Sequence, residues 1–216
     1  MKHPGRVLTL AVAGVLGVSA VAWAANITGT SGPDFLPGTS QADRIRGLGA
    51  NDVIYGLRGN DREEGGTGND RMNGDGTCRP GATDRNYCTD KEDDGGNDRM
   101  EGEQGDDRMQ GGKGNDRMDG NQGNDNVSGE QGNDRTYGNG GDDVVSGGSG
   151  NDRVSGGSGL DDLSGNSGND RIYARDYQVD TIRCGSGFDR VRADKNDEVA
   201  RDCERVKRFK LRRRGR

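Results

Sequence analysis

The sequence lacks most of what a globular enzyme is built from. Hydrophobic residues make up 27% and aromatic residues 4% of the 216 positions, whereas an ordinary domain is roughly half apolar. The only histidine is His3, in a segment that we expect to be removed. The remaining chain then has no histidine to act as a general base or to activate a serine or cysteine. We therefore expect that the protein is not an enzyme.

Glycine is the abundant residue, with 41 copies, and composition of this kind is typical of disordered chains. A strict period argues against disorder here. Over residues 102–173 an aspartate recurs every nine residues, with glycines two and five positions before it and usually an apolar residue two positions after it. These aspartates are Asp107, Asp116, Asp125, Asp134, Asp143, Asp152, Asp161 and Asp170.

The repeat reads G-x-x-G-[N/D]-D-x-U-x, where U is apolar. Residues 111–119 and 147–155 fit the fuller form G-G-x-G-x-D-x-U-x at every position. This pattern resembles the calcium-binding nonapeptide of the RTX family. The resemblance implies an all-β fold, a right-handed parallel β-roll (β-solenoid) with 18 residues per coil, which binds several Ca²⁺ ions between its turns.

The repeats predict how the chain is divided. We expect about sixteen nonapeptides over residues 29–192, interrupted by a loop at 77–95 where the aspartate spacing is 28 instead of nine. The first repeats are less regular, since Gln41 and Ala50 replace the second glycine and Glu63 occupies an apolar position. A C-terminal cap at 193–206 and a basic tail at 207–216 follow.

Residues 1–24 have the pattern of a secretory signal peptide. Lys2 and Arg6 precede an apolar run at 7–21, and residues 22–24 are a small-x-small cleavage motif. The alternative is a membrane anchor, but the run is shorter than the roughly twenty residues that a span needs. We expect a secreted, extracellular protein without a membrane span, which could also be associated with the cell surface.

Each repeat also has a physical interpretation. Its first six residues have the composition of a turn, and the last three alternate outward, inward and outward, as in a short strand with one buried face. The inward position is apolar in fourteen of sixteen repeats, and the position before it is arginine in ten of sixteen. Two turns and two strands make one coil of 18 residues.

Stacked coils bring aspartates of like charge within a few ångströms of each other. Each repeat buries only one side chain, so the apolar core is thin. A cation between the carboxylates is therefore expected. Calcium takes six to eight oxygen ligands, including backbone carbonyls, whereas magnesium demands a tight octahedron and zinc would want histidine or cysteine. The resemblance implies these metal ligands: Asp61, Asp70, Asp98, Asp107, Asp116, Asp125, Asp134, Asp143, Asp152, Asp161, Asp170 and Asp189.

Several residues near the repeat aspartates are weaker candidates. Asp43 and Asp52 lack the second glycine and Asp180 lacks both, so we expect them to be poor ligands. The asparagines before the aspartates, such as Asn115 and Asn133, are expected to stabilise turns.

The four cysteines are an even number, which fits an oxidising compartment. Cys78 and Cys88 could close a small loop within the 77–95 insertion. Cys184 and Cys203 could join the last repeat to the cap. We expect disulfides in both places, because a metal site would need more cysteine or histidine nearby.

Two functions remain open. The first is a secreted calcium-binding protein that folds on binding calcium outside the cell. The second is a structural or adhesive module that presents the 77–95 loop or the basic tail to an envelope partner, which for the basic tail could be an anionic envelope polymer. The net charge is −6, and removing the two cations before Val7 and the seven after Val206 leaves a body of −15. We therefore expect no nucleic-acid binding; the oligomeric state is left open.

Overall fold

The structure is a computed structural model that describes residues 24–75, 77–78, 88–89 and 95–209, with the side chains of 77–78 and 88–89 left out. The described part is built of strands and turns and contains no helix. None of it is therefore a helix long and apolar enough to cross a membrane. The predicted signal segment, apart from Ala24, and residues 210–216 of the predicted tail lie outside the described residues.

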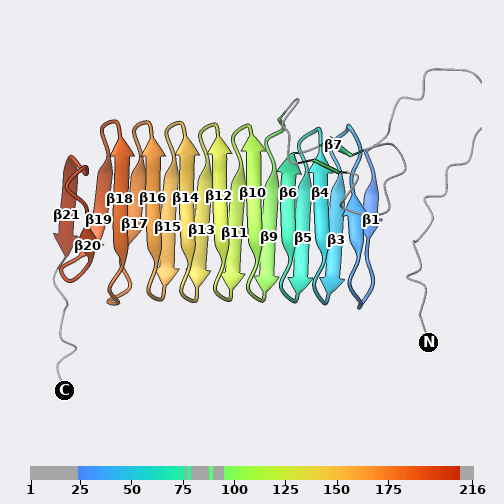
Figure 1. The fold of residues 1–216 in the computed structure, drawn as a ribbon, viewed down its shortest axis with the longest axis horizontal. Coiled ribbons are helices and arrows are strands. Elements are labelled where there is room, and N and C mark those ends of the chain that lie inside the picture. Colours follow the sequence, from blue (N-terminus) through green and yellow to red (C-terminus); the bar gives the residue numbers. More distant parts are fainter. Residues whose placement is uncertain (1–23, 76, 79–87, 90–94, 210–216) are drawn as a thin grey trace, which may run out of the picture.

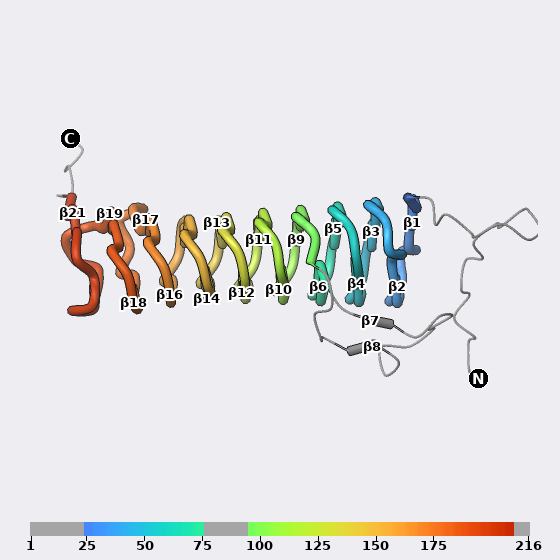
Figure 2. Tube along the Cα trace, turned by 90° about the horizontal axis from the view of Figure 1, so that it is seen from above, coloured from blue at the N-terminus to red at the C-terminus, as the bar shows by residue number. Residues whose placement is uncertain are grey.

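Two long parallel sheets face each other and form an elongated solenoid (Figures 1 and 2). Consecutive strands alternate between the sheets, so two nonapeptides complete one coil, as the sequence predicted. Sheet A contains β1 (Asn26–Thr28), β3 (Arg44–Gly49), β5 (Arg62–Thr67), β9 (Arg99–Gln104), β11 (Arg117–Gln122), β13 (Arg135–Gly140), β15 (Arg153–Ser158), β17 (Arg171–Ala174), β19 (Arg190–Asp194) and β21 (Arg205–Phe209).

Sheet B forms the opposite wall of the solenoid. It contains β2 (Phe35–Pro37), β4 (Val53–Leu57), β6 (Arg71–Asp75), β10 (Arg108–Lys113), β12 (Asn126–Gln131), β14 (Val144–Ser149), β16 (Asp162–Ser167), β18 (Thr181–Ser186) and β20 (Glu198–Val199).

The core is a single layer of side chains between the sheets. The apolar position of each repeat is buried, as predicted, and the register stacks it in columns, with Met100 beside Met118 in sheet A and Met109 beside Val127 in sheet B. Glu63 and Thr136 occupy the same inward position and are also fully buried. The sequence therefore places two polar groups inside an otherwise apolar stack.

The strands are longer than expected. Most span six residues instead of three, because the first glycine of the next repeat continues the strand and is itself buried. The residue after that glycine takes a left-handed conformation even when it is not glycine, with φ of 79° at Glu103 and 80° at Asn121. The prediction that this glycine lies in the turn was wrong.

The second glycine of the repeat does lie in the turn. Gly123 has φ of 130°, and a Cβ there would overlap the carbonyl oxygen of Gly105 in the preceding coil. Only glycine fits both the conformation and the space. Ala50 replaces it in an early repeat and keeps a left-handed φ of 68°.

The solenoid continues across the insertion. β5 pairs with β9 and β6 pairs with β10, so the coils before and after it stack directly. Within the insertion, β7 (Thr77–Cys78) pairs antiparallel with β8 (Cys88–Thr89). Cys78 and Cys88 are direct partners in this pairing; their predicted disulfide lies outside the described side chains.

The chain after the last regular repeat adds one more coil. β20 extends sheet B and β21 extends sheet A as far as Phe209, so the predicted boundary between cap and tail falls inside β21. A disulfide joins Cys184 of β18 to Cys203, at the position that the sequence predicted. It ties this last coil to the regular part of the solenoid.

Candidate metal centre

An aspartate stands immediately before every regular strand, and the coils stack these aspartates into two rows. Row A precedes the strands of sheet A and consists of Asp43, Asp61, Asp98, Asp116, Asp134, Asp152, Asp170 and Asp189. Row B precedes the strands of sheet B and consists of Asp34, Asp52, Asp70, Asp107, Asp125, Asp143, Asp161, Asp180 and Asp197.

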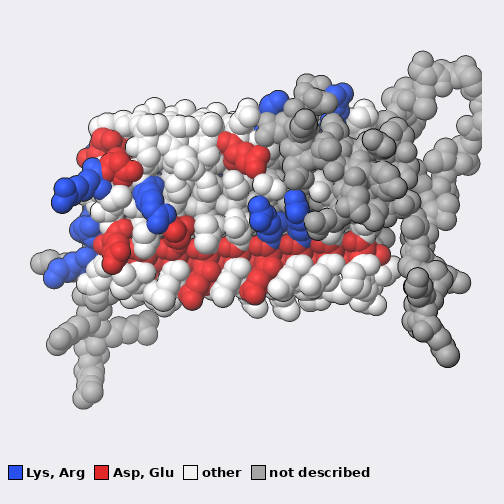
Figure 3. Space-filling model, in the orientation of Figure 1, with Lys and Arg blue, Asp and Glu red and all other residues white. Residues whose placement is uncertain are grey.

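The rows are nearly sealed from solvent. Asp43 and Asp52 onward are at most 5% exposed in both rows, although they sit at the edges of the sheets. Figure 3 shows a continuous line of acidic side chains along the roll, near the end at which the strands of sheet B begin. Rows of buried carboxylates of one sign need a compensating charge or a proton.

One oxygen of each carboxylate is used by the backbone of the neighbouring coil. The N–H of Asp98 donates to Oδ1 of Asp116 at 2.8 Å, and the N–H of Asp116 donates to Oδ1 of Asp134 at 2.8 Å. The same bond recurs through both rows, for example from Asp107 to Asp125 in row B. Aspartates of consecutive coils are therefore adjacent, and main-chain hydrogen bonds hold them together.

The other oxygen has no hydrogen-bond partner. In fourteen aspartates Oδ2 is buried and unpaired: Asp52, Asp61, Asp70, Asp98, Asp107, Asp116, Asp125, Asp134, Asp143, Asp152, Asp161, Asp170, Asp180 and Asp189. The first glycine of the repeat makes room for it, since a Cβ on Gly165 would lie 2.5 Å from Oδ2 of Asp170. Unpaired buried carboxylate oxygens are costly for the protein alone, and they are suitable ligands for a hard cation.

The ends of the rows differ. Oδ2 is paired in both Asp34 and Asp43, because Thr30 and Thr39 each donate a backbone N–H and a hydroxyl to it. Oδ1 of Asp43 accepts the N–H of Ala25 as well. At the other end, Oδ2 of Asp197 accepts the N–H of Asp194. The unpaired oxygens therefore begin at Asp52 and Asp61 and end at Asp180 and Asp189.

Burial raises the pKa of these carboxyl groups. Desolvation is the main cause; the backbone N–H of the preceding coil offsets it in part, and neighbouring aspartates add to it. The pKa rises to about 9 at Asp98 and to about 8 at Asp107 and Asp116. It rises to about 7 at Asp134 and to about 6 at Asp125. Near neutral pH the rows must therefore take up either protons or cations.

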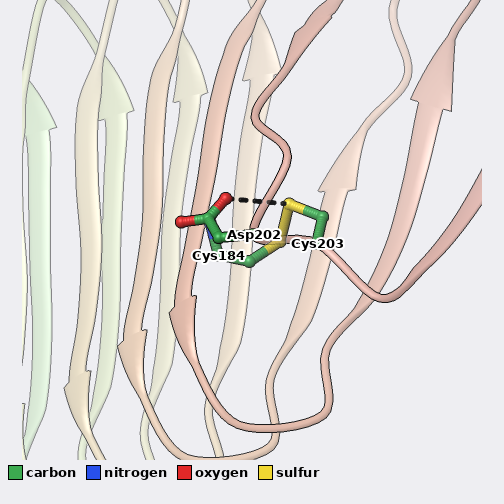
Figure 4. A group of neighbouring side chains, drawn as sticks. All are labelled: Cys184, Asp202 and Cys203. Carbon is green, nitrogen blue, oxygen red and sulfur yellow. Dashed lines mark hydrogen bonds between the residues drawn. A yellow bond between two sulfur atoms is a disulfide. The ribbon is translucent and has the colours of Figure 1, made fainter.

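The donors fit calcium. The candidate atoms are carboxylate oxygens in turns that are rich in glycine carbonyls, which is the all-oxygen environment that calcium prefers. The described residues contain one group with sulfur donors near a carboxylate, made of Cys184, Cys203 and Asp202 (Figure 4). Its sulfurs are bonded to each other, and Asp202 accepts the N–H of Gly185 at 2.9 Å. That group closes the last coil instead of binding metal.

The residues before the aspartates form a second ladder. The N–H of Asn115 donates to Oδ1 of Asn97 at 2.6 Å, and the N–H of Asn133 donates to Oδ1 of Asn115 at 2.8 Å. Their side-chain oxygens are thus occupied by the turn of the next coil. The expectation that these asparagines stabilise turns agrees with this geometry.

Comparison with known families agrees with the geometry. A family model described as the RTX calcium-binding nonapeptide repeat matches residues 28–63, 93–127, 101–136, 119–154, 128–163 and 137–172, which together make up just over half of the chain. The chain belongs to the RTX calcium-binding nonapeptide repeat family. It is thus a calcium-binding repeat protein with a β-roll fold. No curated protein matches its sequence.

Two candidate ligands of this RTX protein were not expected from its sequence. Asp52 and Asp180 were expected to be poor ligands because glycines are missing from their repeats, yet both are buried and both carry an unpaired Oδ2. The repeats in which Oδ2 is paired are those with a threonine directly after the first glycine, at Thr30 and Thr39. This threonine is the signal in the sequence that distinguishes them. The missing glycines change the turn and leave the position of the carboxylate intact.

Proposed function

We propose that calcium ions lie between consecutive aspartates of each row, on both edges of the roll. The proposed ligands are the twelve aspartates that the sequence indicated, from Asp61 to Asp189, together with Asp52 and Asp180. The observation that carries this proposal is the unpaired, buried Oδ2 on every one of them. Calcium supplies a positive charge and open coordination positions that these oxygens fill together with turn carbonyls.

We further propose that the roll folds when calcium binds. The folded chain without cations holds fourteen buried, unpaired carboxylate oxygens, and the single-layer core is too thin to offset many of them. Binding to the folded state alone stabilises it by mass action. This arrangement suits a secreted protein, which meets millimolar calcium outside the cell, where extracellular calcium sites bind in the range of about 0.1–1 mM.

The division of the chain follows from this proposal. Residues 1–24 act as a cleaved signal peptide and 29–192 as the calcium-binding roll, while 193–206 cap it. The Cys184–Cys203 disulfide supports export to an oxidising compartment. No catalytic role is proposed, because the chain after the signal segment has no histidine.

A circular dichroism titration tests the proposal. Metal ions are removed from the chain with a chelator at pH 8, and calcium is then added in steps to about 10 mM, roughly 10-fold above the weakest expected dissociation constant. Magnesium at the same concentrations is the matched control. We expect little β-structure before calcium, a cooperative gain with calcium and a much weaker response to magnesium. A metal-stripped sample that keeps its full β-signal at pH 8 would contradict folding on calcium.

The second candidate, an adhesive module that presents the 77–95 loop or the basic tail, rests on segments that lie mostly outside the described residues. Binding to cell-envelope fractions, with and without residues 79–94, tests the loop. Equal binding by both chains would exclude it.

A further inference from the structure

The arginines of the repeat are divided unequally between the two sheets. The first strand position is arginine in all eight regular strands of sheet A but only at Arg71 and Arg108 in sheet B. The register places the sheet A arginines side by side, with Arg135 beside Arg153, Arg153 beside Arg171 and Arg171 beside Arg190, and Arg205 continues the column. The face of sheet B that Figure 3 shows has only scattered basic side chains.

In the N-terminal half of sheet A this column is neutralised. Two positions further along each strand lies a second outward column, which begins with Arg46 and then carries acidic residues. Arg46 is itself paired with Glu64 at 2.8 Å. Glu64 pairs with Arg44 at 2.9 Å and with Arg62 at 3.2 Å. Glu101 pairs with Arg99 at 2.6 Å, and Asp119 pairs with Arg117 at 3.0 Å.

From β13 onward the second column changes character. The register continues from Asp119 to Tyr137 and onward to Ser155, Tyr173, Arg192 and Lys207. Neither column contains a carboxylate over this half, and within the described residues none of its arginines is in an ion pair with a carboxylate. We call the seven exposed cations the arginine face: Arg135, Arg153, Arg171, Arg190, Arg192, Arg205 and Lys207.

The register spaces the arginine face regularly along sheet A. Adjacent strands of a sheet lie about 4.8 Å apart, so the five arginines from Arg135 to Arg205 span about 19 Å. Each guanidinium presents a fork that binds a carboxylate or sulfate with two hydrogen bonds. Such a row matches an extended chain with an anionic group on every unit or every second unit.

The aromatic rings of this face point to the kind of polyanion. The Tyr137 ring lies under the guanidinium of Arg117, 5.0 Å from its centroid, and the Tyr173 ring lies under Arg153 at 4.6 Å. Arg192 lies over the Tyr173 ring as well, at 5.6 Å. Because these rings already stack on arginines, they offer no free platform for nucleic-acid bases. Phe188, in the turn before β19, is 48% exposed, but its ring lies under the guanidinium of Arg190 at 5.4 Å. Aromatic rings that already contact arginines favour an acidic polysaccharide over single-stranded nucleic acid.

We propose that the C-terminal half of sheet A, the arginine face, is a docking surface for an extended anionic polysaccharide bearing sulfate or carboxylate groups. The surface lies on the roll itself, apart from the insertion and from residues 210–216. It needs the folded roll but no particular assignment of calcium ligands. With calcium between the buried aspartates, the exposed arginines dominate the charge of this face.

Heparin, a sulfated polysaccharide, serves as the probe in calcium-containing buffer. The full mature chain is compared with two triple variants of equal net charge: Arg135→Gln, Arg153→Gln and Arg171→Gln on the face, and Arg44→Gln, Arg62→Gln and Arg99→Gln in the neutralised half. Residues 210–216 are unchanged in all three, so differences between them report on the roll. Circular dichroism checks that both variants are folded.

We expect the parent chain and the control variant to bind heparin alike. The face variant should bind at least 10-fold more weakly near physiological salt, with a salt dependence of log K that is shallower by about 2–3. Equal weakening of both variants, or no retention of the parent chain, would overturn the proposal. Stronger competition by single-stranded DNA than by dextran sulfate would also overturn it, and would assign the face to nucleic acid.

Discussion

The substitution Asp116→Asn should change the stability of the roll in opposite directions with and without calcium. Asp116 is fully buried, its Oδ1 accepts the N–H of Asp98 at 2.8 Å, and its Oδ2 has no partner. Asparagine keeps the Oδ1 acceptor and removes the charge. The variant therefore relieves a cost in the metal-free protein and loses a ligand in the calcium-loaded one.

The magnitude follows from the pKa of Asp116. Burial raises the pKa from 3.8 to about 8; the N–H of Asp98 lowers it in part and the charge of Asp134 adds to it. One pKa unit corresponds to about 1.4 kcal/mol, which sets an upper limit of about 6 kcal/mol at pH 8. Structural relaxation and water at the turn reduce this, and we expect a gain of about 2–4 kcal/mol without metal. At pH 5, where the folded protein already protonates Asp116, the gain should be under about 2 kcal/mol.

Two kinds of titration measure these effects. In chelator at pH 8, folding is induced with the osmolyte trimethylamine oxide, and the variant should fold at a lower concentration than the parent chain. In saturating calcium, urea unfolding should show the variant to be less stable than the parent. Asp43→Asn is the matched control: Asp43 has both oxygens paired, through Ala25 on one and Thr39 on the other, so that substitution should destabilise the roll in both conditions. If Asp116→Asn loses the same stability in chelator as in calcium, the aspartate is only a turn cap and the reasoning fails.

Three further predictions concern the core, the pH response and the turns. Glu63→Met should stabilise the roll by about 1–3 kcal/mol in urea unfolding with calcium, because both oxygens of Glu63 are buried without a partner beside Met100. Thr136→Val should stabilise it less. A loss of stability in Glu63→Met would show that the carboxylate has a role in the core. In chelator, β-content should rise as the pH falls from 8 to 4. The pKa values of about 6–9 in the folded rows exceed the unfolded value of 3.8, so the folded state binds more protons in this window. A fall in β-content with acid would contradict the conclusion that buried, charged aspartates destabilise the metal-free roll. Gly123→Ala should cost at least about 2 kcal/mol because of its positive φ and the carbonyl oxygen of Gly105; Gly140→Ala, at a roomier position, should cost less in the same melt.

The period of nine predicted the architecture because it sets three things together. It places an aspartate at each turn, an apolar side chain on each inner face and a repeat of 18 residues per coil, and the registers of Met118 and Val127 follow directly. The Cys184–Cys203 pairing was predictable from spacing, because a cap must be tied to the last coil. These features depend on periodicity, which is visible in sequence.

Other features depend on contacts between coils, which a single repeat does not show. The sequence predicts that the inward glycine, such as Gly165, lies in the turn. The structure shows that it lies against the carboxylate of Asp170, which leaves no room for a side chain. The difference between Asp34 and Asp43, whose Oδ2 is paired, and the later aspartates depends on threonine hydroxyls four residues earlier in the chain. The concentration of arginines on sheet A is visible in the sequence when alternate repeats are compared. Which of these arginines lack an acidic partner is visible only in the structure, because it depends on the second outward column beside them.

Native mass spectrometry of the folded chain at saturating calcium tests the central claim most directly. Each row has seven aspartates with an unpaired Oδ2 and thus six intervals between neighbours, so one ion per interval gives about twelve ions per chain. Asp116→Asn borders two intervals and should release about two ions, while Asp43→Asn should release none. A chain that binds no calcium, or an Asp116→Asn variant with the full parental count, would contradict the account.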